Sequence, residues 1–168
     1  MTLLLHICDP KIQICRILRE TAASGMPCPY FEPQKVVENS HHPNARLPLL
    51  QEYDGLCHAG SEPVQAPAEL RFDCCNRGYS KGSCARFPLA EARSSMRYSI
   101  LRRTSATLEL ICIEEQNYAP LRWRSVQFFL ESKRLEPELD DACITAQAIA
   151  FCRSYLGRFS SWLLPAGS

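Results

Sequence analysis

The sequence predicts an α+β protein: a proline-rich, cysteine-bearing loop segment followed by a small antiparallel sheet of about three strands packed on a C-terminal helix. Three observations predict it. Residues 27–88 hold eight of the twelve prolines and four of the seven glycines. Residues 96–130 contain strand-length runs rich in β-branched and aromatic side chains. Residues 142–156 are apolar on nearly every side. A chain of 168 residues, 46% of them hydrophobic, can bury such a core.

Residues 1–26 are expected to form an N-terminal extension outside the native fold. Apolar side chains recur there at every third position, at Ile12, Cys15 and Leu18, which suggests a short helix ending near Gly25. A helix of about 12 residues is barely stable on its own. We therefore expect a chain that begins at Met26 to fold as well as the full chain.

Residues 27–168 are expected to form a single domain that begins with the cysteine-rich loop segment 27–88. That segment has few apolar runs that could make long helices or strands. Loops of about 60 residues are uncommon in a compact domain unless something other than hydrophobic burial holds them. A bound metal would supply such a tie.

Residues 96–159 follow a strand–strand–strand–helix pattern. Residues 96–101 and 106–114 are separated by a short polar stretch, which predicts a hairpin. A third strand is expected over 121–130, with a bulge where the apolar parity shifts between Trp123 and Val126.

The final element is expected to be a helix. Pro137 can open it, the acidic residues that follow suit its positive N-terminus, and Gly157 suits its end. Gln147 and Arg153 interrupt an otherwise apolar interior. This helix should therefore pack on the sheet and be covered further by the cysteine-rich segment.

A chain with ten cysteines is either a secreted protein with disulfides or a protein of a reducing compartment that uses its thiolates. No export signal is visible, because the apolar run at Leu3 is interrupted by His6 and Asp9. No run approaches the ~20 apolar residues of a membrane-spanning helix. We expect a cytoplasmic protein with reduced thiols and no membrane contact, in which clustered cysteines favour a metal over disulfides.

Five of the ten cysteines fall in the proline-rich segment, and their surroundings resemble a known group. The resemblance is carried by Met26-Pro-Cys-Pro-Tyr-Phe-Glu-Pro, a lone Cys57, Cys75-Asn-Arg-Gly-Tyr, Cys84 and Phe87-Pro88. These residues resemble a group of small uncharacterised bacterial cysteine-rich proteins that begin with a Cys-Pro-Tyr/Phe-Phe motif. The match covers 26–88 by motif and 96–158 only by its pattern of elements.

The resemblance implies no activity. It implies that Met26 is close to the natural start and that four cysteines form one constellation, Cys28, Cys57, Cys75 and Cys84. Residues 1–25, with Cys8 and Cys15, would then lie outside it.

The residues themselves also favour a four-cysteine site. Thiolates are the ligands of structural zinc and of iron–sulfur clusters, and the order of ligands in sequence is free. Gaps of 28, 17 and 8 residues separate Cys28, Cys57, Cys75 and Cys84. Cys74 and Cys75 are neighbours, and neighbours in an extended backbone point to opposite faces, so one should reach the site. We favour Cys75, because residues 76–78 can form a turn whose amides approach the sulfur; Cys74 is the substitute.

Two kinds of metal centre are compatible with four cysteine ligands. No Cys-x₂₋₄-Cys pair is present, which weakens zinc. Widely spaced cysteines beside proline and glycine are compatible with a [4Fe–4S] cluster for electron transfer or redox sensing. The alternative is a zinc-stapled interaction module without redox or enzymatic activity. A third interpretation, buried apolar thiols without metal, suits Cys112, Cys143 and Cys152.

Other chemistry receives less support. His58 adjoins Cys57 and could replace a cysteine ligand or serve a thiol enzyme, but a neighbour in sequence usually points away. Glu114 and Glu115 form an acid pair that we expect to be surface residues. Phosphate loops, nucleophile elbows and zinc-protease helices are absent from the sequence, so an enzyme is not favoured. The arginines between 86 and 124 fit the wet side of a sheet better than a nucleic-acid face, so a protein partner of unknown identity is favoured.

Overall fold

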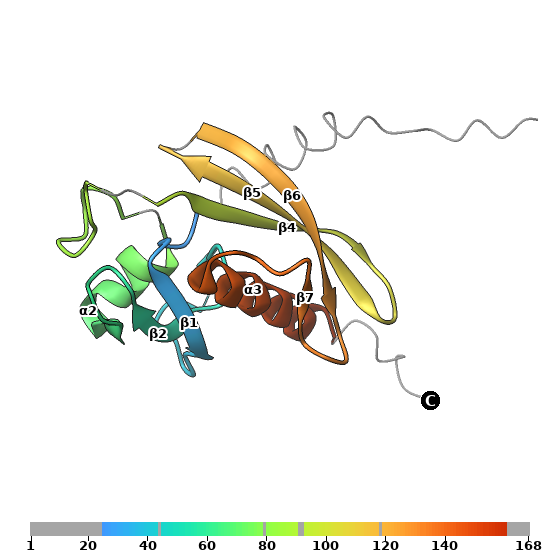
Figure 1. Ribbon diagram of the computed structural model, residues 1–168. Helices are drawn as coiled ribbons and strands as arrows, with labels where there is room; N and C mark the ends of the chain where they lie inside the picture. Colours follow the sequence, from blue (N-terminus) through green and yellow to red (C-terminus); the bar gives the residue numbers. More distant parts are fainter. Residues whose placement is uncertain (1–24, 44, 79, 91–92, 118, 161–168) are drawn as a thin grey trace, which may run out of the picture.

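The computed structural model describes residues 25–43, 45–78, 80–90, 93–117 and 119–160. Two antiparallel sheets and one long helix account for most of its regular structure (Figure 1). The first sheet contains β1 (Phe31–Val36), β2 (Tyr53–Cys57) and β3 (Val64–Gln65); the second contains β4 (Ser95–Arg103), β5 (Thr107–Gln116), β6 (Ala119–Phe129) and β7 (Leu135–Glu136). The long helix is α3 (Ala142–Ser160). The α+β class is confirmed.

The proline-rich segment holds more regular structure than we expected. Its strands are ordered β1-β2-β3, and two short helices follow, α2 (Ala68–Leu70) and the π-helix η1 (Arg71–Asn76). Pro33 hid the first strand from the sequence analysis, because proline cannot donate to a strand ladder. It is tolerated here since β1 is an edge strand whose register shifts between Pro33 and Lys35.

The second sheet is ordered β4-β5-β6-β7, and the expected hairpin is formed by β4 and β5. The bulge in β6 lies elsewhere than predicted. Glu114 pairs with Arg122 and Glu115 with Pro120, which leaves Leu121 as the extra residue. The parity argument failed because Trp123 is half exposed and does not belong to the inward-facing set.

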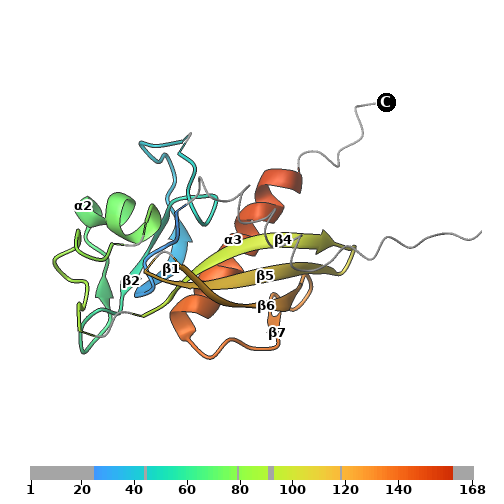
Figure 2. The same cartoon turned by 90° about the horizontal axis from the view of Figure 1, so that it is seen from above.

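Helix α3 begins later than predicted. The Asp141 carboxylate accepts the N–H of Ile144 at 3.0 Å, so Asp141 is the N-cap and Pro137 precedes the helix rather than opening it. Gly157 lies within the helix and does not end it. The helix packs against β1 and β4, and Figures 1 and 2 show it between the two sheets.

A buried amide joins the helix to the cysteine-bearing segment. Gln147 is fully buried, and its Nε2 donates to the carbonyl oxygens of Cys28 at 2.8 Å and Phe31 at 2.7 Å. Its Oε1 accepts a hydrogen bond from the Tyr98 hydroxyl of β4 at 3.3 Å. One side chain therefore links α3, the second sheet and the turn that carries Cys28.

Gln147→Met should lower the free energy of unfolding by about 2–3 kcal/mol, because two buried carbonyls lose their donors while the volume is nearly kept. Gln127→Met is the matched control, since Gln127 is exposed on β6, and it should change stability by no more than about 0.5 kcal/mol. Urea unfolding measures both. Equal effects of the two substitutions would contradict the role given to Gln147.

Candidate metal centre

Backbone hydrogen bonds bring the cysteine-bearing segments together. Cys28 lies in the turn before β1, where its N–H donates to the carbonyl of Cys75 in η1 at 3.0 Å. Cys57 is the last residue of β2. Cys84 closes a turn in which its N–H donates to the Ser80 carbonyl at 3.0 Å. A turn, a strand, a helix and a second turn thus each carry one of the four predicted ligands.

The four predicted ligand thiols are close enough to influence one another electrostatically. The thiol of Cys28 interacts with those of Cys57 and Cys84. The thiol of Cys75 interacts with all three. The fold therefore brings Cys28, Cys57, Cys75 and Cys84 into one region, although residues far apart in the sequence carry them.

Burial and the proximity of the other thiols raise the pKa of Cys28 and of Cys75. Burial raises the pKa of Cys28 to about 12; the thiols of Cys57 and Cys84 add to the rise, and the Tyr30 N–H and Ser80 hydroxyl oppose it. Burial and the neighbouring thiols also raise the pKa of Cys75. Negative sulfurs in a buried place repel each other, so the thiols of Cys28 and Cys75 stay protonated at neutral pH unless a cation joins them.

Cys74 also reaches the group. It lies on η1 with Cys75, and successive side chains on a helix do not point to opposite faces. Its pKa is raised by burial and then by Cys84, with which it shares a hydrogen bond. The extended-backbone premise that separated Cys74 from Cys75 was therefore wrong.

Asn76 holds the helix η1 against the first sheet. Its Oδ1 accepts the Tyr53 N–H at 2.8 Å, and its Nδ2 donates to the carbonyls of Tyr53 at 2.9 Å and Arg71 at 3.0 Å. We expected amides of residues 76–78 to approach a sulfur. The amide that does so in the described cluster is that of Tyr30, at Cys28.

The cysteine cluster has a buried and an open side. Cys28, Cys74 and Cys75 are buried, whereas Cys57 and Cys84 are partly exposed. A surface hollow of about 410 Å³ borders Cys57 and is also lined by Glu62 and Arg86. Of the two partly exposed thiols, Cys57 lines this hollow.

As the side chains stand, no three Cys, His, Asp or Glu residues of the described chain are grouped closely enough to hold a metal ion. Cys8 and Cys15 lie outside the described residues. Cys112, Cys143 and Cys152 are buried, and burial raises the pKa of each to about 12. Cys143 also interacts electrostatically with Cys57, which the sequence did not suggest.

The remaining candidates are engaged in ion pairs. The His58 Nε2 lies 2.6 Å from the Glu32 carboxylate, so that side of the ring is bonded to an acid. Glu115 is buried, not a surface residue, and pairs with Arg97 at 2.8 Å. Glu114, its neighbour, pairs with Arg122. The two glutamates therefore do not act as a catalytic acid pair.

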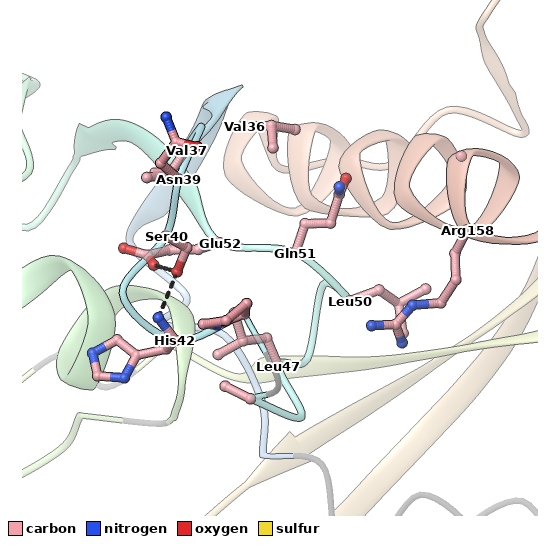
Figure 3. Close-up of a pocket in the computed structure, with 13 residues that line it drawn as sticks. Val36, Val37, Asn39, Ser40, His42, Leu47, Leu50, Gln51, Glu52 and Arg158 are labelled. Carbon is pink, nitrogen blue, oxygen red and sulfur yellow. Dashed lines mark hydrogen bonds between the residues drawn. The ribbon is translucent and has the colours of Figure 1, made fainter.

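A second hollow of about 400 Å³ lies between the loop after β1 and the end of α3 (Figure 3). Its wall includes Glu52, a buried carboxylate that accepts hydrogen bonds from Ser40 and from Arg71. His42, also on the wall, stacks its ring on Phe72 at a centroid distance of 3.7 Å. Both donors satisfy the Glu52 carboxylate, and the His42 ring is stacked on Phe72, so this hollow carries less chemistry than the cysteine cluster. Sequence reasoning missed Glu52, because nothing in its surroundings predicts burial.

Comparison with known proteins found no matching family model, no matching curated protein and no matching solved structure. Across the part of the chain that the structure describes, no helix is both long and apolar enough to traverse a lipid bilayer. The site must therefore be interpreted from its own residues.

The raised thiol pKa values predict how metal-free protein responds to alkali. The folded state raises the pKa of the Cys28 and Cys112 thiols to about 12, whereas the same thiols in the unfolded chain ionise near pH 9. This stability is complete below about pH 9 and is lost as the pH rises toward 12. Cys112→Val should lessen the fall in unfolding free energy by up to about 1.4 kcal/mol per pH unit above pH 9. Urea titrations of chelator-treated, reduced protein would measure it; identical slopes for the two proteins would refute it.

Proposed function

We propose that this chain is a small cysteine-ligated metal protein that carries a [4Fe–4S] cluster for electron transfer or redox sensing. Cys28, Cys57, Cys75 and Cys84 would hold the cluster. When bound, such a cluster supplies reversible one-electron transfer. The observation that carries the proposal is the mutual electrostatic interaction of these thiols across four separate structural elements.

The donor set fits such a group chemically. Iron–sulfur clusters are held by four cysteine thiolates, whose charge a cationic metal core offsets. The described cluster contains thiols that burial and mutual repulsion otherwise keep protonated, and it gathers them where Tyr30 and Ser80 donate hydrogen bonds to Cys28. Hydrogen bonds to the sulfurs and restricted solvent are also what tune a cluster's potential.

Zinc is the second candidate, as a staple in an interaction module without redox or enzymatic activity. It uses the same thiolates, and the short-spaced cysteine pair typical of zinc sites is lacking. Cys74, which shares a hydrogen bond with Cys84, is a fifth candidate ligand for either metal. For either metal, we also propose membership of the small bacterial cysteine-rich group, a cytoplasmic location and a protein partner that docks on the molecule.

Anaerobically purified protein should be brown, with broad absorption at about 400 nm and about four iron and four sulfide per chain. Metal analysis and the absorption spectrum test this together. Colourless protein with about one zinc per chain would select the staple instead. Metal-free protein that stays fully folded in reductant would reject both.

Single alanine substitutions test the ligand set. Cys28→Ala, Cys57→Ala, Cys75→Ala and Cys84→Ala should each lose the metal and loosen the cysteine-rich segment, because metal-binding free energy contributes to folding in such sites. Cys112→Ala should keep the metal, since this thiol lies in the core shared by β5 and α3.

Cys74→Ala separates the two neighbours on η1. It should retain metal if Cys75 is the ligand, and Cys75→Ala should then lose it. Metal content and thermal midpoint are the measurements for all six variants. Retained metal in two or more of the four proposed ligand variants would show that the ligand set is wrong.

A further inference from the structure

Strand β6 has a backbone edge that β7 covers only in part. β6 contains 11 residues, whereas β7 contains 2 and pairs only with Gln127 and Phe128. Figures 1 and 2 show β6 extending well past β7. Within the described ranges, no strand pairs with residues 119–126 on the side opposite β5. These residues form an open edge of the second sheet.

Backbone hydrogen bonds fix which groups of β6 point toward this open edge. The Phe129 N–H donates at 2.9 Å to a carbonyl just before β7, and the Leu130 N–H donates at 2.9 Å to a carbonyl just before β5. Successive residues of an antiparallel strand alternate between its two sides. The register of β6 is regular from Arg122 onward. Trp123 and Ser125, which have the parity of Phe129, therefore direct their N–H and carbonyl groups to the open edge.

The open edge can accept a short added strand. Among the described residues, no backbone group bonds to Trp123 or Ser125 on this side. An added strand would satisfy their donors and acceptors in the way that β5 satisfies those of the residues between them. Trp123 is 49% exposed and Leu121 is 56% exposed, which provides apolar contact at the same place. Pro120, which has no N–H, limits the pairing surface at one end, and β7 limits it at the other.

The charged residues of the open edge are both arginines. Arg122 and Arg124 flank Trp123, and residues 119–126 contain no acid. Alternate side chains of a strand lie on opposite faces, so the two arginines share the face that Trp123 does not use. Both line a hollow of about 300 Å³ that is also lined by Met96 and Ile144. A strand added to the edge would place alternate side chains beside this hollow.

Both arginines already have a carboxylate partner, and both can bind another. Arg122 pairs with Glu114, yet its side chain is 75% exposed. Arg124 pairs at 3.4 Å with Asp140, whose side chain is 91% exposed. Ion pairs so open to solvent contribute little, and a guanidinium has five N–H donors. A further carboxylate can therefore join or replace these partners without breaking a buried contact.

The same arginines disfavour a second copy of this chain at the open edge. Two copies would pair their β6 strands antiparallel about a two-fold axis. If Trp123 paired with Ser125 of the other copy, Arg124 would lie opposite its own counterpart. If Trp123 paired with its own counterpart, Arg122 would lie opposite Arg124 of the other copy. A register centred on Ser125 would need Gln127, which β7 already pairs. Like charges directly opposite each other destabilise a strand pair.

We infer that the open edge of β6 binds an extended acidic segment of another protein, in which two carboxylates flank an apolar residue. The carboxylates face Arg122 and Arg124, and the apolar residue lies beside Trp123. Backbone hydrogen bonds supply affinity in this mode of recognition, and the alternate side chains supply specificity. None of these residues is a proposed metal ligand, so the inference does not depend on the cluster.

Amide hydrogen exchange, followed by NMR, tests the open edge. In the protein alone, the amides of Trp123 and Ser125 should exchange about tenfold faster than those of Arg124 and Val126, which bond to β5. A capped heptapeptide with a central Glu-Val-Glu should slow the two fast amides on the order of tenfold at saturation and leave the two slow ones unchanged. Equal rates at all four amides of the free protein, or no change with the peptide, would overturn the inference.

A matched heptapeptide with a central Lys-Val-Lys tests the charge of the partner. Titrations followed by Trp123 emission in a Trp162→Phe background should show about tenfold weaker binding of the lysine peptide than of the glutamate peptide. Equal affinities would overturn the acidic partner. A concentration-dependent dimer that protects the Trp123 and Ser125 amides without any peptide would also overturn it, in favour of a second copy.

Charge reversal on the protein tests the same contact from the other side. The double variant Arg122→Glu, Arg124→Glu should prefer the lysine peptide. The double variant Arg102→Glu, Arg103→Glu reverses two exposed arginines at the far end of β4 and should keep the preference for the glutamate peptide. An unchanged preference in the first variant, or a reversed one in the second, would contradict the assignment of the arginines.

Discussion

The primary amide of Gln147 is the interaction on which the rest of the described structure depends. A neutral amide carries two N–H donors and a carbonyl acceptor, and here both kinds of group are used inside the core. Its two accepting carbonyls, of Cys28 and Phe31, bracket the turn that also closes on itself through the Phe31 N–H. The position of the first cysteine is thus set by the helix and not by its own short loop.

The cysteine cluster combines a buried half with a partly exposed one. Cys28 and Cys75 are tied to each other through the backbone, and their elements are anchored by Gln147 and Asn76. Cys57 and Cys84 are partly exposed and border solvent. If the proposed metal is bound, solvent would reach it from the side of Cys57 and Cys84.

The sequence predicted elements wherever one physical signal dominated. Alternating side chains revealed the β4–β5 hairpin, and the apolar run revealed α3. The prediction from sequence failed where signals conflicted. Pro33 concealed β1, and Asp141 caps the helix that Pro137 was expected to open. The clustering of cysteines followed from composition, but the helical geometry that admits Cys74 could not, because local sequence does not distinguish a π-helix from a turn. Burial of Glu115 was equally hidden, since its ion-pair partner Arg97 lies on another strand.

Asn76 takes the place of a neighbouring strand at the start of β2. Its side-chain amide offers Tyr53 the same donor and acceptor pair that a neighbouring strand would offer. One residue therefore occupies the start of β2 on the side that β3 does not reach, since β3 pairs only with Leu56 and Cys57, and it blocks the addition of a foreign strand there. Deamidation of Asn76 would replace the donating nitrogen with a negative oxygen facing two carbonyls, of Tyr53 and Arg71. Such a change would remove the donor and add repulsion, so the start of β2 would be open to pairing with another strand.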